Sequence, residues 1–489
     1  MRILQITPEA RPWAKTGGLA DVAGALTDRL ARRGHEVTLA IPLYRTVRED
    51  GHADAPIVWR PGAEGPDLPV PVVVRELAAG SPGPRVLAVD APDLFDREGL
   101  YGDTYGDYSD NLLRFSVFVR AALAAAGPSR PDVVHAHDWQ AALAPVYVRA
   151  GLAVGTDSRP ALILTLHNLA YQGQFPADRW ADTGLPPEWF RADRLESFGR
   201  IHLLKGGILA ADRVTTVSPG YAREIGTPAL GFGLDGLLAG LPHPVEGILN
   251  GIDTEEWDPA RDPHLPAPFE PADLGGKAAA KAALQAEFGL PEIPDVPLFG
   301  LVSRLVEQKG LGLIEAVRGR LGDWPAQFVL LGTGEPRFEA LLRDLAASLP
   351  NVGARVAFSE RLAHLVEAGS DFFLMPSAFE PCGLNQMISQ RYGTIPVVHG
   401  VGGLADTVVD VSPEALAEGS ATGIVFRHFD APALCWAIDT AIEIHADPVR
   451  LDALRQAGMR TDFSWERSGR RYEELYERTL ADRRAERDD

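Results

Sequence analysis

Lys15-Thr16-Gly17-Gly18-Leu19-Ala20-Asp21 stands between a short apolar run, RILQIT at 2–7, and a helical stretch that begins LADVAGAL. Its last five residues return as Gly-Gly-Leu-Ala-Asp at 402–406, again after an apolar run and before a helical stretch. Paired glycines permit positive φ and close backbone approach, and the first turn of a helix offers N–H groups and partial positive charge. The repeat predicts one anion-binding loop in each half of the chain, with two simple tight turns as the alternative.

Short apolar strands alternate with amphipathic helical stretches through both halves. This alternation predicts βαβ units and parallel sheets that are buried on both faces. The expected strands of the first half are RILQIT (2–7), EVTLAI (36–41), RVLAVD (85–90), DVVHAH (132–137), ALILTLH (161–167) and RVTTVS (213–218). Those of the second half are PLFGLVS (297–303), AQFVLLG (326–332), DFFLMPS (371–377), IPVVHG (395–400) and TGIVF (422–426). The predicted fold class is α/β, with two Rossmann-like, doubly wound domains.

A proline-rich connection separates the two series of strands. Prolines favour extended or turn structure, and they stand at positions 259, 263, 266, 268 and 271. We place the boundary just before VEGILNGID, which gives domains of residues 1–244 and 245–463. The helical tail at 464–489 is expected to pack back on the first domain. Open α/β sheets bind ligands at the carboxyl ends of their strands, so we expect the two domains to face an interdomain cleft.

Composition excludes several classes of function. The formal net charge of −20 argues against a nucleic-acid partner, because such binding needs a basic face. No apolar run approaches the roughly 20 residues of a membrane helix, and no signal-peptide segment opens the sequence. We therefore expect a cytoplasmic protein without a membrane partner. The two cysteines form no disulfide framework, and no Cys/His cluster has zinc-ligand spacing.

Lysine is rare, since only five of the 47 basic residues are lysines. Lys15, Lys205 and Lys309 stand close to glycines, and a compact ammonium binds a phosphate as a point charge. Chance is the alternative for such a small sample, and for Lys205 it is an equal one. Lys277 and Lys281 lie on the Ala-rich stretch KAAAKAAL and are expected to be solvated.

Polar side chains end two strands of the first half. His135, His137 and Asp138 close DVVHAHD, and His167 ends ALILTLH. Such groups at strand ends can hydrogen-bond sugar hydroxyls. Asp138 and His167 are the stronger ligand candidates, whereas support of the core is an equal interpretation for the other two histidines. Asn250, in ILNGID near the domain boundary, either contacts ligand or belongs to a hinge.

The second half places cations and a carboxylate after its strands. Arg304 and Lys309 are expected to neutralise a diphosphate leaving group, because no acidic pair has metal-ligand context. Surface charge is the alternative for both. Glu380, after DFFLMPS, is the carboxylate best placed to stabilise the reacting sugar. Cys382 has no recognisable His partner, so we reject nucleophilic catalysis there and keep packing as the alternative.

Nine motifs together resemble the bacterial glycogen synthases and plant starch synthases. They run in that family's order, cover nearly the whole chain and are far more specific than a lone glycine-rich loop. They are KTGGLADV (15–22), HAHDWQA (135–141), LHNLAYQG (166–173), LLKGGI (203–208), GILNGID (247–253), SRLVEQKG (303–310), LLGTGEP (330–336), FEPCGLNQ (379–386) and GGLADT (402–407).

The resemblance implies the GT-B architecture and retaining transfer of glucose from ADP-glucose to the non-reducing 4-hydroxyl of an α-1,4-glucan such as glycogen. It implies no metal and no other cofactor. The implied catalytic residues are Lys15, His167, Arg304, Lys309 and Glu380. The residues implied to bind the nucleotide sugar are Lys15, Gly17, Gly18, Asn250, Phe358, Cys382, Gly383, Gly402 and Gly403. Asp138 is implied to line the acceptor side.

Four positions depart from the family pattern. Ala378 replaces a frequent arginine, Asn385 stands where many relatives have Thr, and Ile388 stands where related retaining transferases carry a second Glu. Phe358 replaces a usual Tyr but keeps a ring that can stack on adenine. These departures leave UDP-glucose as the alternative donor.

Other functions on the same scaffold are less favoured. A transferase for another acceptor disagrees with the unbroken HAHDWQA and LHNLAYQG motifs. A phosphorylase would need a pyridoxal phosphate lysine, for which the sequence has no candidate. A non-catalytic glucan-binding protein should have lost some of the implied catalytic residues, and all of them are present. Nothing in the sequence indicates an oligomeric state.

Overall fold

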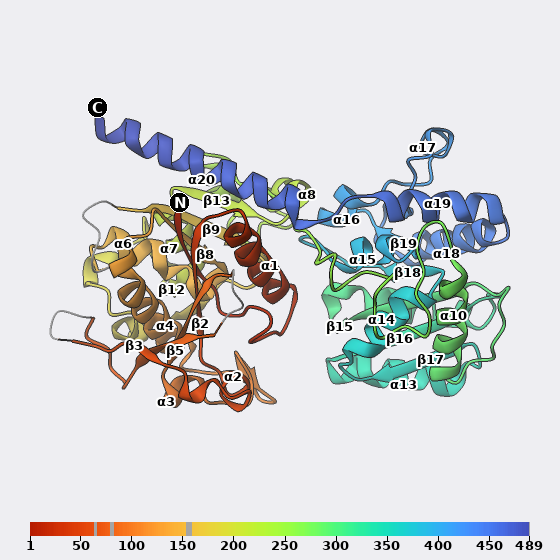
Figure 1. Cartoon of the computed structure of the whole chain (residues 1–489), viewed down its shortest axis with the longest axis horizontal. Helices are drawn as coiled ribbons and strands as arrows, with labels where there is room; N and C mark the ends of the chain where they lie inside the picture. Colours follow the sequence, from red (N-terminus) through yellow and green to blue (C-terminus); the bar gives the residue numbers. More distant parts are fainter. Residues whose placement is uncertain (63–65, 79–82, 153–158, 489) are drawn as a thin grey trace. The chain divides into compact units, whose positions relative to one another are not determined.

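The computed structural model describes residues 1–62, 66–78, 83–152 and 159–488. The chain divides into two compact units, each built around its own sheet (Figure 1). The first unit comprises Met1–Val217, Ala222–Gly251 and Trp465–Asp489, and the second comprises Ser218–Tyr221 and Ile252–Ser464. The last residue of the predicted tail, Asp489, lies outside the described residues.

The sheet of the first unit has nine strands among the described residues, in the order β14-β13-β9-β8-β1-β2-β5-β4-β3. The strands from β14 to β5 are parallel, whereas β4 and β3 add an antiparallel edge that the sequence did not predict. Their bounds are β1 Arg2–Ile6, β2 Glu36–Pro42, β3 Ile57–Trp59, β4 Val73–Leu77, β5 Arg85–Asp90, β8 Val133–His137, β9 Ala161–Leu166, β13 Arg213–Thr216 and β14 Glu246–Gly247. Because β14 pairs with β13, the first unit runs to Gly251, past our boundary at residue 245.

The sheet of the second unit is wholly parallel among the described residues, in the order β17-β16-β15-β18-β19-β20. The bounds are β15 Leu298–Leu305, β16 Gln327–Gly334, β17 Val352–Val356, β18 Phe372–Met375, β19 Ile395–His399 and β20 Ile424–Phe426. Five of these strands match the predicted runs, and β17 is additional. Phe299, Leu301 and Phe328 are buried in the apolar core of this unit.

The strand order reverses once in each sheet. β1 lies between β2 and β8, and β15 lies between β16 and β18. At such a reversal, loops leave neighbouring strands in opposite directions and open a crevice at the carboxyl ends, where ligands bind. The loops after β1, β8, β15 and β18 are therefore the expected ligand positions. They carry Lys15, Asp138, Lys309 and Glu380.

Helices lie on both faces of each sheet (Figure 1). The main helices of the first unit are α1 Gly18–Arg32, α4 Asn111–Ala126, α5 Asp138–Ala141, α6 Leu143–Arg149, α7 Leu203–Ala210 and α20 Trp465–Asp488. Those of the second unit are α10 Gly275–Glu287, α11 Leu311–Ala316, α13 Pro336–Ser348, α14 Glu360–Gly369, α15 Asn385–Arg391, α16 Gly402–Thr407, α18 Ala431–His445 and α19 Pro448–Arg460.

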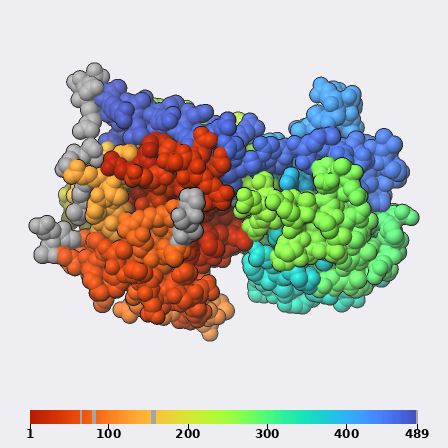
Figure 2. Space-filling model, viewed as in Figure 1, coloured from red at the N-terminus to blue at the C-terminus, as the bar shows by residue number. Residues whose placement is uncertain are grey.

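The C-terminal helix α20 returns to the first unit. Its Tyr472, Leu475 and Tyr476 are buried in one apolar cluster with Ile3 of β1 and Leu26 of α1. Figure 2 shows the C-terminal residues, in blue, against the red N-terminal surface. The helix α20 begins more than 200 residues after β14, the last strand of this sheet. Burial of its apolar stripe attaches it to the sheet that carries the Lys15 loop.

One helical stretch among the described residues, Asn111–Ser129, is long and apolar enough to cross a membrane by length and composition, with a mean hydropathy of 1.2. The sequence prediction had not identified it. Of its 18-residue window, 78% is buried inside the protein, as in the core helices of water-facing folds. Length and composition alone are therefore a weak indication of a membrane span here.

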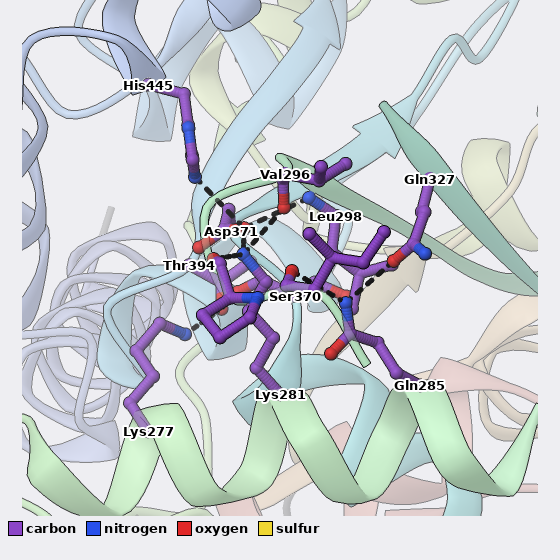
Figure 3. A network of polar contacts seen from close by, with 12 residues as sticks. Lys277, Lys281, Gln285, Val296, Leu298, Gln327, Ser370, Asp371, Thr394 and His445 are labelled. Carbon is purple, nitrogen blue, oxygen red and sulfur yellow. Dashed lines mark hydrogen bonds and ion pairs between the residues drawn. The ribbon is translucent and has the colours of Figure 1, made fainter. Parts of the chain in front are cut away.

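Lys277 and Lys281 are buried, so the prediction that both are solvated is wrong. The Lys277 ammonium donates to the carbonyls of Ala368 and Tyr392 at 2.8 and 3.0 Å, and Lys281 donates to Asp371 at 2.7 Å. Figure 3 shows both side chains leaving one face of α10 for this polar network. A spacing of four residues places the two lysines on the same helix face, together with the buried Leu284.

Lys205 also has a structural role. Its Nζ donates to the carbonyls of Ala192 and Glu196 at 2.6 and 2.5 Å and so holds the chain before β12 (Arg200–His202). Three of the five lysines therefore serve the fold, and scarcity of lysine carries little weight for the two that remain.

Candidate active site

A buried carboxylate shapes the loop that follows β1. Glu9 accepts hydrogen bonds from the backbone N–H groups of Thr16 and Gly17 at 2.5 and 3.3 Å, and from the Tyr101 hydroxyl at 2.8 Å. Burial raises the pKa of Glu9, while these hydrogen bonds oppose the rise. The sequence prediction missed Glu9. The signal in the sequence that could have identified Glu9 was an acidic residue three positions after the end of β1, in a loop that is predicted to bind an anion.

Lys15 and Gly17 lie in this loop with different constraints. The Lys15 Nζ is partly exposed and lies 2.8 Å from Asp21 Oδ1 on α1. Gly17 has an extended φ of −160°, and a Cβ added there would meet nothing within 4 Å. Neither positive φ nor crowding therefore requires glycine at 17, contrary to our reasoning from the sequence. The space beside its Cα is open to a ligand, which is compatible with the predicted contact between the Gly17–Gly18 backbone and the nucleotide sugar.

The second Gly-Gly loop differs from the first. Gly402 has a φ of +45°, and a Cβ on Gly403 would lie 2.1 Å from the carbonyl oxygen of Cys382. The Gly403 N–H donates to the Glu380 carbonyl at 3.1 Å. This N–H is therefore engaged within the protein, and the contact of Gly403 with the nucleotide sugar stays a prediction. The two copies share a helix start but not the same loop geometry.

Asp138 and His167 meet where β8 and β9 end. The Asp138 Oδ1 accepts the backbone N–H of His167 at 2.6 Å. The His167 Nε2 lies 3.0 Å from Nδ1 of His137. The two predicted ligand residues therefore contact each other. One carboxylate oxygen of Asp138 is used to hold the backbone at the end of β9.

Asp138 is held in an unusual state. Its φ of +57° lies in the left-handed region, which non-glycine residues adopt mostly where the surroundings enforce it, often at functional sites. Burial raises the pKa of Asp138 to about 7, although the N–H groups of His167 and Asn168 favour the carboxylate. The side chain is therefore divided between its acid and carboxylate forms near neutral pH.

In the second unit, Lys309 and Glu380 form an ion pair. The Lys309 Nζ donates to Glu380 Oε2 at 2.6 Å, and the Ser377 hydroxyl donates to the same oxygen at 3.0 Å. Glu380 is buried, while Lys309 keeps part of its ammonium exposed. An ammonium has three N–H groups, so this pairing leaves Lys309 with donors for a phosphate.

Gly310 makes that pairing possible. Its φ is +73°, and a Cβ at 310 would lie 1.8 Å from the carbonyl oxygen of Pro376. The Ala378 N–H donates to Gln308 at 2.9 Å beside it. The turn after β15 and the loop after β18 therefore touch backbone to backbone, because residue 310 has no side chain.

Arg304 and Phe358 are exposed. The Arg304 guanidinium makes no hydrogen bond or ion pair with any residue that the structure describes. Phe358 is 80% exposed and directly precedes Ser359, which caps α14. An exposed cation and an exposed ring close to strand ends are accessible to a ligand, and the contacts predicted for Arg304 and Phe358 stay predictions.

Of three further predicted residues, Cys382 and Asn250 are buried and Gly383 is half-buried. Cys382 is a free thiol, and its carbonyl accepts from Gln386 at 3.0 Å. Gly383 needs to be glycine, because its φ is +72° and a Cβ would meet Gln386 at 2.4 Å. The Oδ1 of buried Asn250 has no hydrogen-bond partner among the described residues. The burial of Cys382 fits the packing alternative, its contact with the nucleotide sugar stays a prediction, and Asn250 keeps an unused acceptor.

The predicted residues fall into two groups, one in each unit, and we call each group a half-site because a ligand is predicted there. In the first unit, the loop with Lys15 and Gly17 follows β1, and Asp138 and His167 follow the neighbouring β8 and β9. The half-site of the second unit gathers Lys309, Glu380, Cys382, Gly383, Gly402 and Gly403 around the ends of β15, β18 and β19.

One group of described residues has ligand types and spacing that could hold a metal ion. The ligand atoms of Glu256, Glu360 and His364 lie within 4.8 Å of one another. His364 already pairs with Asp262 through Nδ1 at 2.7 Å. Exposed acidic groups of this kind are common without an ion, so the group assigns no metal.

A family model matches just under half of the chain, and one group of relatives matches nearly all of it. The model of the starch synthase catalytic domain matches residues 2–240. A glycogen synthase from Anaeromyxobacter sp. (strain Fw109-5) is 48% identical over 486 residues, which cover 98% of this chain and 100% of that relative.

Solved structures match over the same extent. The catalytic domain of starch synthase IV from Arabidopsis thaliana, bound to ADP and acarbose, has a TM-score of 0.86 and 35% identity, and the match covers 98% of this chain and 99% of that chain. A sucrose-phosphate synthase from Thermosynechococcus elongatus has a TM-score of 0.62 and 18% identity, covering 98% of this chain and 100% of that chain, which shows the fold alone. The predicted α/β GT-B fold class is confirmed, and the interdomain cleft stays a prediction.

Proposed function

The chain belongs to the family of glycogen synthases and starch synthases, and from this premise we propose that it uses ADP-glucose, with the residues of the two half-sites in the roles set out below. It is a hexosyltransferase and a glycogen synthase by family. The transferred glucose joins the non-reducing 4-hydroxyl of an α-1,4-glucan, with the anomeric configuration retained and ADP released. We also place the enzyme in the cytoplasm.

The observation that carries the donor assignment is the likeness to starch synthase IV. That protein was solved with ADP and acarbose, and the match covers 98% of this chain at a TM-score of 0.86. Acarbose is a glucan analogue, so nucleotide and glucan occupy one catalytic domain in that relative. The exposed Phe358 supports an adenine nucleotide, because its ring offers a face for stacking.

The half-site of the second unit stabilises the leaving ADP. As the C1–O bond loosens, negative charge grows on the distal phosphate and positive charge on the sugar. Arg304 has no partner among the described residues, and Lys309 keeps free donors, so both can meet the phosphate without first breaking a strong contact. Glu380 holds the Lys309 ammonium in place and brings negative charge toward the cationic sugar.

The half-site of the first unit holds the sugar and the acceptor. Lys15 and the open backbone at Gly17 approach the donor phosphate and glucose. His167 donates or accepts a hydrogen bond at a glucose hydroxyl, and Asp138 lines the acceptor side. As the bond from C1 to the phosphate oxygen breaks, the acceptor oxygen bonds to C1 from the same face, which retains configuration, and the hydroxyl proton passes to the leaving phosphate.

An incorporation assay tests this proposal. Purified protein is given glycogen primer and ADP-glucose or UDP-glucose labelled in the glucose, without added metal, and label in precipitated glucan is measured. Transfer from ADP-glucose at a kcat/KM well above that from UDP-glucose is expected. A preference for UDP-glucose would overturn the donor assignment, and no transfer from either would overturn the proposed function.

A further inference from the structure

Three imidazole rings lie in a row on one side of β8 and the end of β9. His135 and His137 are two residues apart on a strand, so their side chains share a face, and their ring centroids lie 4.1 Å apart. The ring of His167 continues the row at 5.2 Å from His137. We call His135, His137 and His167 the histidine row.

His135 is an ordinary buried histidine with two partners. Its Nδ1 lies 2.8 Å from the Tyr476 hydroxyl of α20, and its Nε2 lies 2.6 Å from the Thr165 hydroxyl of β9. Both ring nitrogens are satisfied, and the contacts join α20 to two strands. The core-support interpretation therefore fits His135 well.

His137 is different, because only one of its nitrogens has a partner. Nδ1 lies 3.0 Å from His167 Nε2, while Nε2 is buried without a hydrogen-bond partner among the described residues. A buried polar atom without a partner destabilises the folded state, and native proteins keep few of them. An apolar residue at 137 would avoid that loss in a fully buried strand. Support of the core therefore does not explain a histidine here.

His167 is held at two points. Asp138 accepts its backbone N–H at 2.6 Å, and His137 contacts its ring at Nε2. No partner for Nδ1 is found among the described residues, so this nitrogen is left for a ligand. Burial lowers the pKa of His137 to about 3 and also lowers that of His167. The contact is thus a hydrogen bond between two neutral rings, which fixes the direction of the His167 ring.

We propose that His137 is a positioning residue for glucosyl transfer, which holds the His167 ring so that Nδ1 meets a hydroxyl of the transferred glucose. This inference rests on the proposed function, in which His167 contacts that sugar. A ring that is free to rotate would spend part of its time turned away from the glucose, and loss of alignment lowers the rate of the chemical step. His137 itself touches no substrate.

Four variants separate positioning from packing. His137→Leu keeps a buried side chain and removes the hydrogen bond, whereas His137→Asn keeps a polar atom near the place of Nδ1. His167→Ala and the double variant with His137→Leu test whether His137 acts through His167. His135→Leu is the matched control, because it removes an equally buried histidine whose partners are Thr165 and Tyr476.

Turnover and thermal stability are measured together. For His137→Leu we expect kcat to fall about 10- to 100-fold with little change in KM for ADP-glucose, and a smaller loss of Tm than in His135→Leu, because His137→Leu leaves one buried partner atom unsatisfied and His135→Leu leaves two. His137→Asn should recover part of kcat, and the double variant should be no slower than His167→Ala. His135→Leu should lose Tm and keep its kcat per folded molecule.

Full kcat in His137→Leu, or a double variant slower by the product of both single effects, would overturn the positioning role. So would a loss of Tm in His137→Leu as large as in His135→Leu. If the wild type transfers no glucose from either nucleotide sugar, the proposed function fails and this inference fails with it. An active wild type beside an unimpaired His137→Leu overturns the inference alone.

Discussion

Lys309 Nζ lies 2.6 Å from Glu380 Oε2, and this pair joins the turn after β15 to the loop after the neighbouring β18. The sequence predicts that Lys309 neutralises the leaving phosphate and that Glu380 stabilises the reacting sugar. Their contact makes the two roles dependent on each other, since a carboxylate that holds an ammonium also fixes where its other donors lie. The strand reversal in the second unit brings both loops to one place.

Removing one partner of this pair should affect activity and stability differently. Lys309→Ala leaves the buried Glu380 carboxylate without its cation, so we expect a lower Tm and a kcat/KM reduced about 100-fold or more. Adding Glu380→Gln to that variant removes the uncompensated charge. The double variant should therefore regain Tm without regaining activity, as measured by thermal unfolding and glucan incorporation. Recovery of activity in the double variant would contradict the phosphate role of Lys309.

Arg304 should behave as a pure activity residue. Its side chain is exposed and has no partner among the described residues, so Arg304→Ala removes no contact of the folded protein. We expect kcat/KM to fall about 100-fold with an unchanged Tm. Arg343→Ala is the control, because Arg343 is exposed in the same unit and, within the described part of the chain, pairs only with Glu339 one turn away on its own helix. Near-normal turnover of Arg304→Ala would remove Arg304 from the leaving-group site.

Most of the fold could be predicted from the sequence, because a strand that is buried on both faces appears in the sequence as a short, continuous apolar run. The parallel strands of both sheets derive from runs such as ALILTL and FFLM, whose residues are buried on each face. The antiparallel strands β3 and β4 escaped prediction, because no residue of β3 is buried and three of the five residues of β4 are only half-buried. Their runs are short and lack the uniform apolar character that marked the central strands.

The candidate site was harder to predict, because side-chain partners depend on the tertiary structure. A glycine pair looks the same at 17–18 and 402–403, yet an added Cβ would meet nothing at Gly17, whereas Gly402 has a positive φ and a Cβ at Gly403 would meet the Cys382 backbone. Glu9 belongs to none of the recognised motifs. Its carboxylate gains hydrogen-bond partners such as the Thr16 N–H only when the loop after β1 folds over it. Lys277 appeared solvated on an Ala-rich helix, although carbonyls at the ends of other elements bind its ammonium.

Gly310→Ala should lower both stability and activity. A Cβ at 310 would meet the Pro376 carbonyl at 1.8 Å, so the turn that carries Lys309 has to move away from Glu380. Gly289→Ala is a matched control, because Gly289 has nearly the same φ, +71° against +73°, with nothing within 4 Å of an added Cβ. The control should lose about 1–2 kcal/mol from backbone strain and stay active. Gly310→Ala should lose more stability and most of its kcat/KM; equal losses in the two variants would contradict the close approach.

Titration of Asp138 should make the free energy of unfolding depend on pH, and Asp138→Asn should remove this contribution. Burial raises its folded pKa to about 7, against about 4 in an unfolded chain. Between these values the folded protein keeps a proton that the unfolded chain has released, so the free energy of unfolding falls as pH rises toward 7, and the loss is complete above it. Asn carries no such proton. The Tm of Asp138→Asn relative to wild type should therefore increase from pH 4.5 to about pH 7 and stay level above it, by thermal unfolding at matched ionic strength. A difference that is constant across this range would show that Asp138 is ionised throughout, and would place its carboxylate in a more polar setting than the ends of β8 and β9 provide.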